Sequence, residues 1–372
     1  MVYFALAFSR PLQNLWLLTA SLAFYAWGEP IFVFFLVVSI IVNWALGLKI
    51  ARTVGSAGPL ALTVGLNLAL LFFSKYLGMI ITTLNYLLNM NFPSFYPSAF
   101  PLGVSFFTLQ AISYAVDIHR REAEPLKSPI SLGLYLSFFP LMVAGPVVHF
   151  ADISGQLAAR QSSWSKFSLG SLRLVTGLAK YALLAVPLGH IADRIFGLSS
   201  LGVMVTVPAL LALMGLVAFA FHLYFFLSGF ADMAIGLGLI FGFEFRENFD
   251  YPYWATSLTE FWQKWNISVV TWFDKYFFQP LRASRTSPGR APGRKTYSYG
   301  FDLVLVWILF GLWNGPDWTF CLWGPFRALF CCLKTLPRFR KAMSRYLSSG
   351  STWSLFFCSV GRFFGPGICT TP

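Results

Sequence analysis

The stretch from Leu201 to Leu227 reads LGVMVTVPALLALMGLVAFAFHLYFFL and contains no Asp, Glu, Lys or Arg. About 20 apolar residues are enough for a helix to cross the hydrocarbon core of a bilayer. The apolar residues here follow one another continuously, whereas a membrane β-strand alternates apolar with polar residues. The stretch therefore predicts a membrane-spanning helix.

Similar apolar runs lie on both sides of it. Hydrophobic residues make up 57% of the 372-residue chain and charged residues only 11%, whereas about a quarter of a soluble protein is charged. We expect an all-α integral membrane protein, a polytopic helical bundle with roughly eight to ten crossings, in which shorter runs form re-entrant or interfacial helices. The other runs are Leu15–Trp27, Ile31–Leu48, Leu60–Phe73, Pro101–Val116, Ile130–Val148, Phe167–Leu188, Ala231–Phe243, Leu303–Leu312 and Trp318–Leu333.

The two ends of the chain differ from its middle. Residues 1–346 are expected to form one polytopic membrane domain, and residues 347–372 an atypical C-terminal tail such as a truncation or frameshift produces. Met1–Leu22 has a single Arg and no convincing signal-peptide cleavage site. The N-terminus fits either a start inside a longer first helix or a short interfacial segment.

Positive charge is concentrated in two places. The net charge is +13, from 27 Lys and Arg against 14 Asp and Glu. The segment Arg282–Lys295 has five basic and no acidic residues, and no acidic residue follows Asp317. In a membrane protein this distribution is typical of cytoplasmic segments, so nucleic acid is not expected as a partner. Anionic membrane lipid is one possible partner of these segments, and the phosphates of coenzyme A are another.

The cysteines give no sign of a metal site. All five lie between Cys321 and Cys369, without a CxxC pair or a Cys/His cluster. Metal ligands usually come at such spacings, so no metal is expected.

Ionisable side chains inside apolar stretches are candidates for function, because a charge in the membrane is costly. His222 and Asp232 lie in one such stretch, Glu260 lies in an aromatic segment, and Asp317 follows the string GLWNG. Each is alternatively a helix-end charge or a member of an ion pair, and Glu260 and Lys264 have the spacing of a helical pair.

Tryptophans accompany these groups. The segment Tyr251–Leu281, with Trp262, and the region of Trp313 combine aromatic with polar residues. Such composition suits either the membrane interface or the wall of a polar cavity. Beyond a polar interior near residues 222–275 and 313–317, the residues alone predict nothing more specific.

A series of short strings adds a resemblance. They are PLGVSFFT at Pro101–Thr108, SYAVD at Ser113–Asp117, YLSFFP at Tyr135–Pro140, AGP at Ala144–Pro146, SGFADMAIG at Ser228–Gly236, ENFDYPY at Glu247–Tyr253, TEFW at Thr259–Trp262, WNIS at Trp265–Ser268, GLWNG at Gly311–Gly315 and WTF at Trp318–Phe320. In this order the strings resemble the membrane-bound O-acyltransferase family, in its bacterial branch of alginate O-acetylation and teichoic-acid D-alanylation. The resemblance is strong over 101–152 and 220–324 and fainter over 14–75.

The resemblance implies a fold and an activity. It implies helices around a central tunnel in a multi-pass protein of the bacterial cytoplasmic (inner) membrane. It implies acyl transfer from a thioester donor, acetyl-CoA or an acyl carrier, to a hydroxyl of an exported polysaccharide such as alginate. A periplasmic or extracellular acetylase partner is the other acceptor that it implies.

Two positions depart from the family pattern. Asn266 stands where the bacterial motif has the His of Trp-His-Ile-Ser, and Asn314 where it has the signature catalytic His of Leu-Trp-His-Gly. Both are expected in the catalytic place, with Asp232, Glu260, Trp262, Trp313, His222 and Asp317 as substrate-tunnel candidates. An amide cannot take up a proton near neutral pH, and general-base catalysis contributes about 10²–10⁴-fold.

The asparagines leave more than one interpretation open. The chain is either an acyltransferase weakened at Asn314 or a catalytically silent membrane scaffold or acyl conduit for a partner acetylase. In the first case His222 or Asp317 is the alternative base. An unrelated transporter is a third interpretation, but no inverted repeat supports it.

Overall fold

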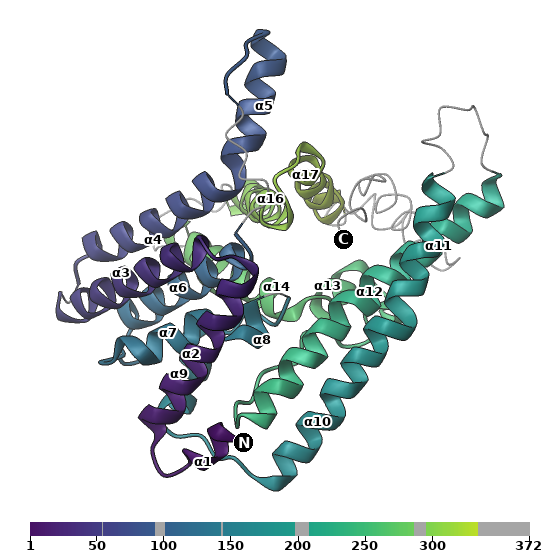
Figure 1. Cartoon of the computed structure of the whole chain (residues 1–372). Helices are drawn as coiled ribbons and strands as arrows, with labels where there is room; N and C mark the ends of the chain where they lie inside the picture. Colours follow the sequence, from purple (N-terminus) through teal and green to yellow (C-terminus); the bar gives the residue numbers. More distant parts are fainter. Residues whose placement is uncertain (54, 94–100, 143, 198–207, 286–294, 334–372) are drawn as a thin grey trace. The chain divides into compact units, whose positions relative to one another are not determined.

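The computed structural model describes residues 1–53, 55–93, 101–142, 144–197, 208–285 and 295–333 (Figure 1). Every regular element in these ranges is a helix, so the predicted all-α class is confirmed. The chain divides into two compact units that alternate along the sequence. The first unit comprises Met1–Val175 and Ala231–Trp272, and the second comprises Thr176–Phe230 and the chain from Phe273 onward.

The first unit contains most of the short helices. Both of its stretches end inside a helix, α10 at Val175 and α14 at Trp272, and each of these helices continues into the second unit. Its elements are α1 (Val2–Ala5), α2 (Arg10–Gly28), α3 (Phe32–Arg52), α4 (Gly58–Leu71), the π-helix η1 (Phe72–Tyr76), α5 (Leu77–Leu88), α6 (Val104–His119), α7 (Pro129–Ser137), α8 (Phe139–Met142), α9 (Phe150–Ala158), the first part of α10 (Trp164–Ala179), the last part of α12 (Ala209–Ile240), the 3₁₀ turn η4 (Pro252–Trp254), α13 (Leu258–Lys264) and α14 (Ile267–Phe273) up to Trp272.

The second unit contains the remaining helices. Its elements are the end of α10, the π-helix η2 (Lys180–Ala185), α11 (Val186–Gly197), the first part of α12, the π-helix η5 (Asp274–Phe278), α15 (Gln279–Arg285), α16 (Lys295–Asn314) and α17 (Trp318–Leu333).

Helix α6 is the centre of the first unit. Its side chains are buried almost all the way round, which is the pattern of a core helix. The small side chains of Ala111 and Ala115 are fully buried, and the Tyr114 ring packs edge to face on Phe150, with the two centroids 4.8 Å apart. A Cβ at Gly47 of α3 would overlap the Tyr114 ring, so glycine is what allows α3 to approach.

Long apolar helices confirm a multi-pass membrane protein. In the part of the chain that the structure describes, four helical stretches have the length and hydropathy of a spanning helix: residues 32–52, 58–88, 164–197 and 209–240. The expected total of roughly eight to ten crossings stays a prediction, because the other helices are shorter.

The long helices α10 and α12 run side by side (Figure 1). Within the first unit, a Cβ at Gly236 would lie 2.7 Å from the Gly170 carbonyl oxygen. Within the second unit, a Cβ at Gly229 would lie 2.9 Å from the Gly177 carbonyl oxygen. Small residues at such contacts let two backbones approach closely in a membrane.

One apolar run is not a single helix. Residues 130–148 form α7, then the short α8, and then an extended segment that leads to α9. Pro140 accounts for the break between α7 and α8, because proline lacks the amide donor that a continuous helix needs. The expectation of one membrane domain over 1–346 stays a prediction, and the tail 347–372 lies outside the described residues.

Candidate functional site

A buried hydrogen-bond network joins three of the motif strings within the first unit. Asn248 accepts hydrogen bonds on its Oδ1 from the Ser268 amide (3.1 Å) and hydroxyl (2.8 Å). The Ser268 hydroxyl oxygen in turn accepts one from the Val147 amide (2.9 Å). The Asn248 carbonyl accepts from the Ile267 amide (2.9 Å). The segments 144–148, 247–253 and 265–268 are thereby fixed against one another.

Asn266 is held by this network in an unusual backbone conformation. Its φ is +47°, in the left-handed region that only glycine and, to a lesser extent, asparagine adopt readily. Its carbonyl accepts from the amides of Val269 (3.1 Å) and Val270 (3.2 Å), which begins α14. The residue therefore sits on the corner between α13 and α14, with its backbone fixed on both sides.

Glu260 acts within its own helix. Ser257 caps α13 by accepting the Glu260 amide (3.1 Å), and Glu260 reaches back to the Thr256 amide and hydroxyl (both 2.8 Å). This is a capping arrangement. The Thr256 amide, followed by Lys264 and the Thr256 hydroxyl, lowers the pKa of Glu260 to about 2. Its neighbour Trp262 is buried, with its ring edge to face with Phe261.

Asp232 belongs to an ion-pair cluster. The Arg173 guanidinium donates to Asp232 Oδ1 (2.9 Å) and to the Glu247 carboxylate. The one guanidinium thereby lies between two carboxylates and donates charge-assisted hydrogen bonds to both. In the first unit, Asp232 therefore links α10, α12 and the ENFDYPY string.

His222 lies on α12 against the end of the π-helix η2. Its Nδ1 is 2.8 Å from the Ala185 carbonyl oxygen. A carbonyl only accepts, so Nδ1 carries the proton and, in the neutral ring, Nε2 keeps the lone pair of a base. A Cβ at Gly189 would come within 2.8 Å of the ring, so glycine provides its space.

The helical hairpin of α16 and α17 holds the remaining candidates. The exposed Asn314 ends α16 and donates from Nδ2 to the Phe310 carbonyl (2.8 Å). Asp317 accepts the Thr319 amide (2.7 Å) and hydroxyl (2.6 Å) at the start of α17. Trp313 is half-buried, with its ring centroid 6.3 Å from that of Phe310.

The candidates thus fall into two groups. Glu260 and Asp317 bond at helix starts and Asp232 is in an ion pair, which are the alternatives that the sequence left open for the ionisable groups. The first unit holds Asp232, Glu260, Trp262 and Asn266, and the second holds His222, Trp313, Asn314 and Asp317. A cavity that joins Asn266 to Asn314 stays a prediction.

Buried charges that the sequence interpretation missed lie elsewhere in the first unit. Lys75, in η1, is 8% exposed and donates to the Ser105 hydroxyl (3.1 Å). Arg160 donates to the Tyr3 hydroxyl (3.0 Å) and Asn14 Oδ1 (2.7 Å), and it lies over the Phe243 ring. The available signal is Lys75 itself, which lies in the middle of the apolar stretch 58–88 but just beyond the predicted run Leu60–Phe73. Among the described residues no His, Cys, Asp and Glu gather in a group that could hold a metal ion.

Comparison with known proteins identifies the family of this chain. The sequence pattern of the membrane-bound O-acyltransferase family matches residues 64–358. The chain belongs to the membrane-bound O-acyltransferase family. The match includes the Asn248 network, the Asn266 corner and the α16–α17 hairpin, so these are features of an O-acyltransferase-family protein.

Individual relatives indicate which acyl-transfer activities occur among similar proteins. A probable alginate O-acetylase from Azotobacter vinelandii is 34% identical over 88% of this chain and 64% of its own length. A peptidoglycan O-acetyltransferase from Helicobacter pylori is 33% identical over 84% of the chain and 62% of its own length. A teichoic acid D-alanyltransferase from Bacillus subtilis is 26% identical over 70% of the chain and 65% of its own length. The chain thus spans somewhat less than two thirds of the length of these relatives.

Proposed function

We propose that this chain serves O-acetylation of an exported polysaccharide, by moving an acetyl group to a sugar hydroxyl. The observation that carries the proposal is the 34% identity to probable alginate O-acetylases over 87–88% of the chain. The bacterial cytoplasmic membrane is the proposed location, because polysaccharide leaves the cell there and the long apolar helices require a bilayer.

The proposed reaction is transfer of an acyl group from a thioester. The hydroxyl oxygen attacks the thioester carbonyl carbon, a C–O bond forms, and the C–S bond breaks. A base takes the hydroxyl proton, and the departing thiolate leaves as the thiol after protonation. Acetyl-CoA or an acylated carrier protein is the proposed donor. The acceptor is either the polysaccharide itself or a periplasmic or extracellular acetylase partner.

The identity of the base is set apart by an asparagine. Asn314 stands in the proposed catalytic place, and an amide cannot take the proton. His222 is the alternative base with support in the structure, because its Nδ1–H···O=C hydrogen bond leaves Nε2 as the basic nitrogen. We therefore propose that native acetylation is weak, and that the second candidate function, an acyl conduit without catalysis of its own, rests on the same asparagine.

Complementation tests the proposal. The native chain, Asn314→His and Asn314→Ala are expressed in an alginate-exporting bacterium that lacks its own O-acetylase. Acetate released from the polymer by mild alkali is measured. We expect Asn314→His to raise acetylation about 10²-fold or more over the native chain, because a base is restored.

His222→Gln provides the matched control. If His222 is the working base, the native chain is active, His222→Gln abolishes activity, and Asn314→Ala changes little. If neither the native chain nor Asn314→His acetylates polymer while both reach the membrane, the acyltransferase proposal fails and the conduit remains.

A further inference from the structure

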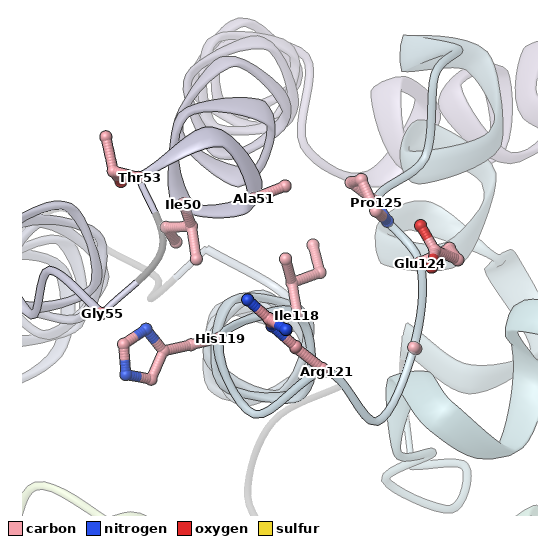
Figure 2. Close-up of a pocket in the computed structure, with 10 residues that line it drawn as sticks. Ile50, Ala51, Thr53, Gly55, Ile118, His119, Arg121, Glu124 and Pro125 are labelled. Carbon is pink, nitrogen blue, oxygen red and sulfur yellow. The ribbon is translucent and has the colours of Figure 1, made fainter.

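A polar pocket lies in the first unit, beside the C-terminal ends of α3 and α6. It has a volume of about 260 Å³. Its walls are the end of α3, the turn after it, the end of α6 and the loop that follows (Figure 2). The residues that decide its chemistry are His119, Arg121 and Glu124, while Ile50, Ala51 and Ile118 make its apolar side.

Opposite charges in the pocket are left without protein partners. In the described chain, the Arg121 guanidinium and the Glu124 carboxylate have neither a hydrogen bond nor an ion pair, although both line the same pocket. Their neighbours in the loop behave differently, since Arg120 pairs with Glu122 at 3.7 Å. The pocket is thus ready for a ligand that carries both signs of charge.

The backbone puts Arg121 there at a cost. The Glu122 amide bonds to the Asp117 carbonyl and the Arg121 amide to the Ile118 carbonyl, which is the Schellman ending of a helix. Glycine is usual at the left-handed position of this motif, yet Arg121 occupies it with a φ of +60°. The arrangement aims a long cationic side chain along the end of α6.

The pocket also lies where the membrane surface is expected. On α3, Val38, Ile41 and Ala45 form an exposed stripe that continues to the exposed Lys49 and Arg52. An apolar stripe of this kind faces lipid, and basic side chains at its end reach the headgroup layer. A lipid whose chains lie on α3 would therefore have its headgroup at the level of the pocket.

We propose that this pocket binds the phosphoethanolamine headgroup of a zwitterionic phospholipid. The phosphate pairs with the Arg121 guanidinium, and the His119 ring is placed to add a hydrogen bond. The ammonium pairs with Glu124, helped by the negative C-terminal ends of α3 and α6. A soluble ester such as glycerophosphoethanolamine would offer the same phosphate and ammonium charges. Only a lipid would also place apolar chains on the exposed stripe of α3.

Lipid retention by the purified full-length chain tests the proposal. Native mass spectrometry counts the bound lipid during titration with dioleoyl phosphatidylethanolamine, phosphatidylglycerol or phosphatidylcholine. We expect phosphatidylethanolamine to bind tightest. Arg121→Gln should weaken its binding about tenfold, as loss of a charge-assisted hydrogen bond does. Glu124→Gln should remove the preference over phosphatidylglycerol, because only the ammonium contacts Glu124.

Arg120→Gln and Glu122→Gln are the matched controls, because they change the same charges in the same loop outside the pocket. If these controls weaken binding as much as the pocket variants, or if none of the four does, the proposal is overturned. Glycerophosphoethanolamine separates lipid from soluble ester. If it raises the melting temperature in detergent as far as the lipid does at equal concentration, the site takes a soluble phosphate ester and the lipid proposal fails.

Discussion

Asn266 shows how one backbone angle restricts the choice of residue. Its left-handed conformation suits glycine, is tolerated by asparagine, and is costly for residues with other side chains. Asn266→Ala should lower the stability of the detergent-solubilised protein by about 1 kcal/mol, whereas Asn266→Gly should preserve it. Thermal unfolding measures both, with Asn314→Ala on a helix end as the control. An equal loss for Ala and Gly would show that the side chain, not the backbone, determines the effect.

Glu260 predicts a pH dependence of stability. Its pKa is about 2 in the folded protein, below the ordinary value of about 4.3, because the Thr256 amide and Lys264 stabilise the carboxylate. The stabilisation is therefore complete above the ordinary pKa and disappears as the pH falls toward 2. Glu260→Gln should lower the melting temperature at pH 7, and the difference from the native chain should shrink as the pH falls from about 5 toward 2.

Thr256→Val is the partner experiment. It removes the hydroxyl donor to Glu260 but keeps the amide donor. The pH dependence should therefore be reduced but not abolished. A pH-independent difference between Glu260→Gln and the native chain would contradict the role of the carboxylate charge.

At the scale of elements, the approach of α10 to α12 depends on glycine. Gly236→Ala places a methyl group 2.7 Å from the Gly170 carbonyl oxygen, and the two backbones must move apart. We expect a loss of about 1–3 kcal/mol, as overpacking costs elsewhere. Gly65→Ala on α4 meets nothing within 4 Å and should be neutral or stabilising. Unfolding in detergent compares the two, and equal melting temperatures would contradict the close contact.

The sequence predicted the helices better than their contacts. Apolar runs give α3, α6, α10 and α12 because a helix satisfies its own backbone hydrogen bonds in lipid. The Asn248–Ser268 network could not be predicted, since it joins segments that are far apart in the chain. The position of the π-helix η1 could not be predicted from the periodicity of the apolar residues either.

In the candidate site, too, the residues could be predicted but their contacts could not. Asn266, Asp232 and Glu260, which the motif strings single out, all lie in the first unit. The strings did not show that Glu260 caps its own helix or that Arg173 pairs with Asp232. Those roles follow from side-chain partners that only the folded chain brings together. The chemical role of Asn314 stays a prediction, because it depends on a comparison of the amide with the imidazole in activity.

For the whole molecule, the charge distribution predicts an orientation. The segment from Arg282 to Lys295, most of which lies outside the described residues, carries five basic residues and should be cytoplasmic. With the five native cysteines replaced by serine, a cysteine at position 287 should react with a membrane-impermeant maleimide only after the cells are opened. Labelling of intact cells would reverse the orientation. A cysteine at Lys127, in the basic loop beside the pocket, should behave in the same way.

The π-helix η1 at Phe72–Tyr76 has a consequence for how the length of this segment can change in evolution. Asn67 and Lys75 are both buried, yet in an unbroken α-helix residues eight apart differ by about 80° around the axis. The π-helix η1 turns through a smaller angle per residue, so it brings the two side chains to the same side of the helix. The loss of one residue before Lys75 would let the segment become an ordinary α-helix, in which the lysine follows Asn67 by seven residues and lies only about 20° from it around the axis. A one-residue gap within residues 72–76 of an alignment would therefore mark the loss of the π-helix, with the ammonium group still on the same side of the helix.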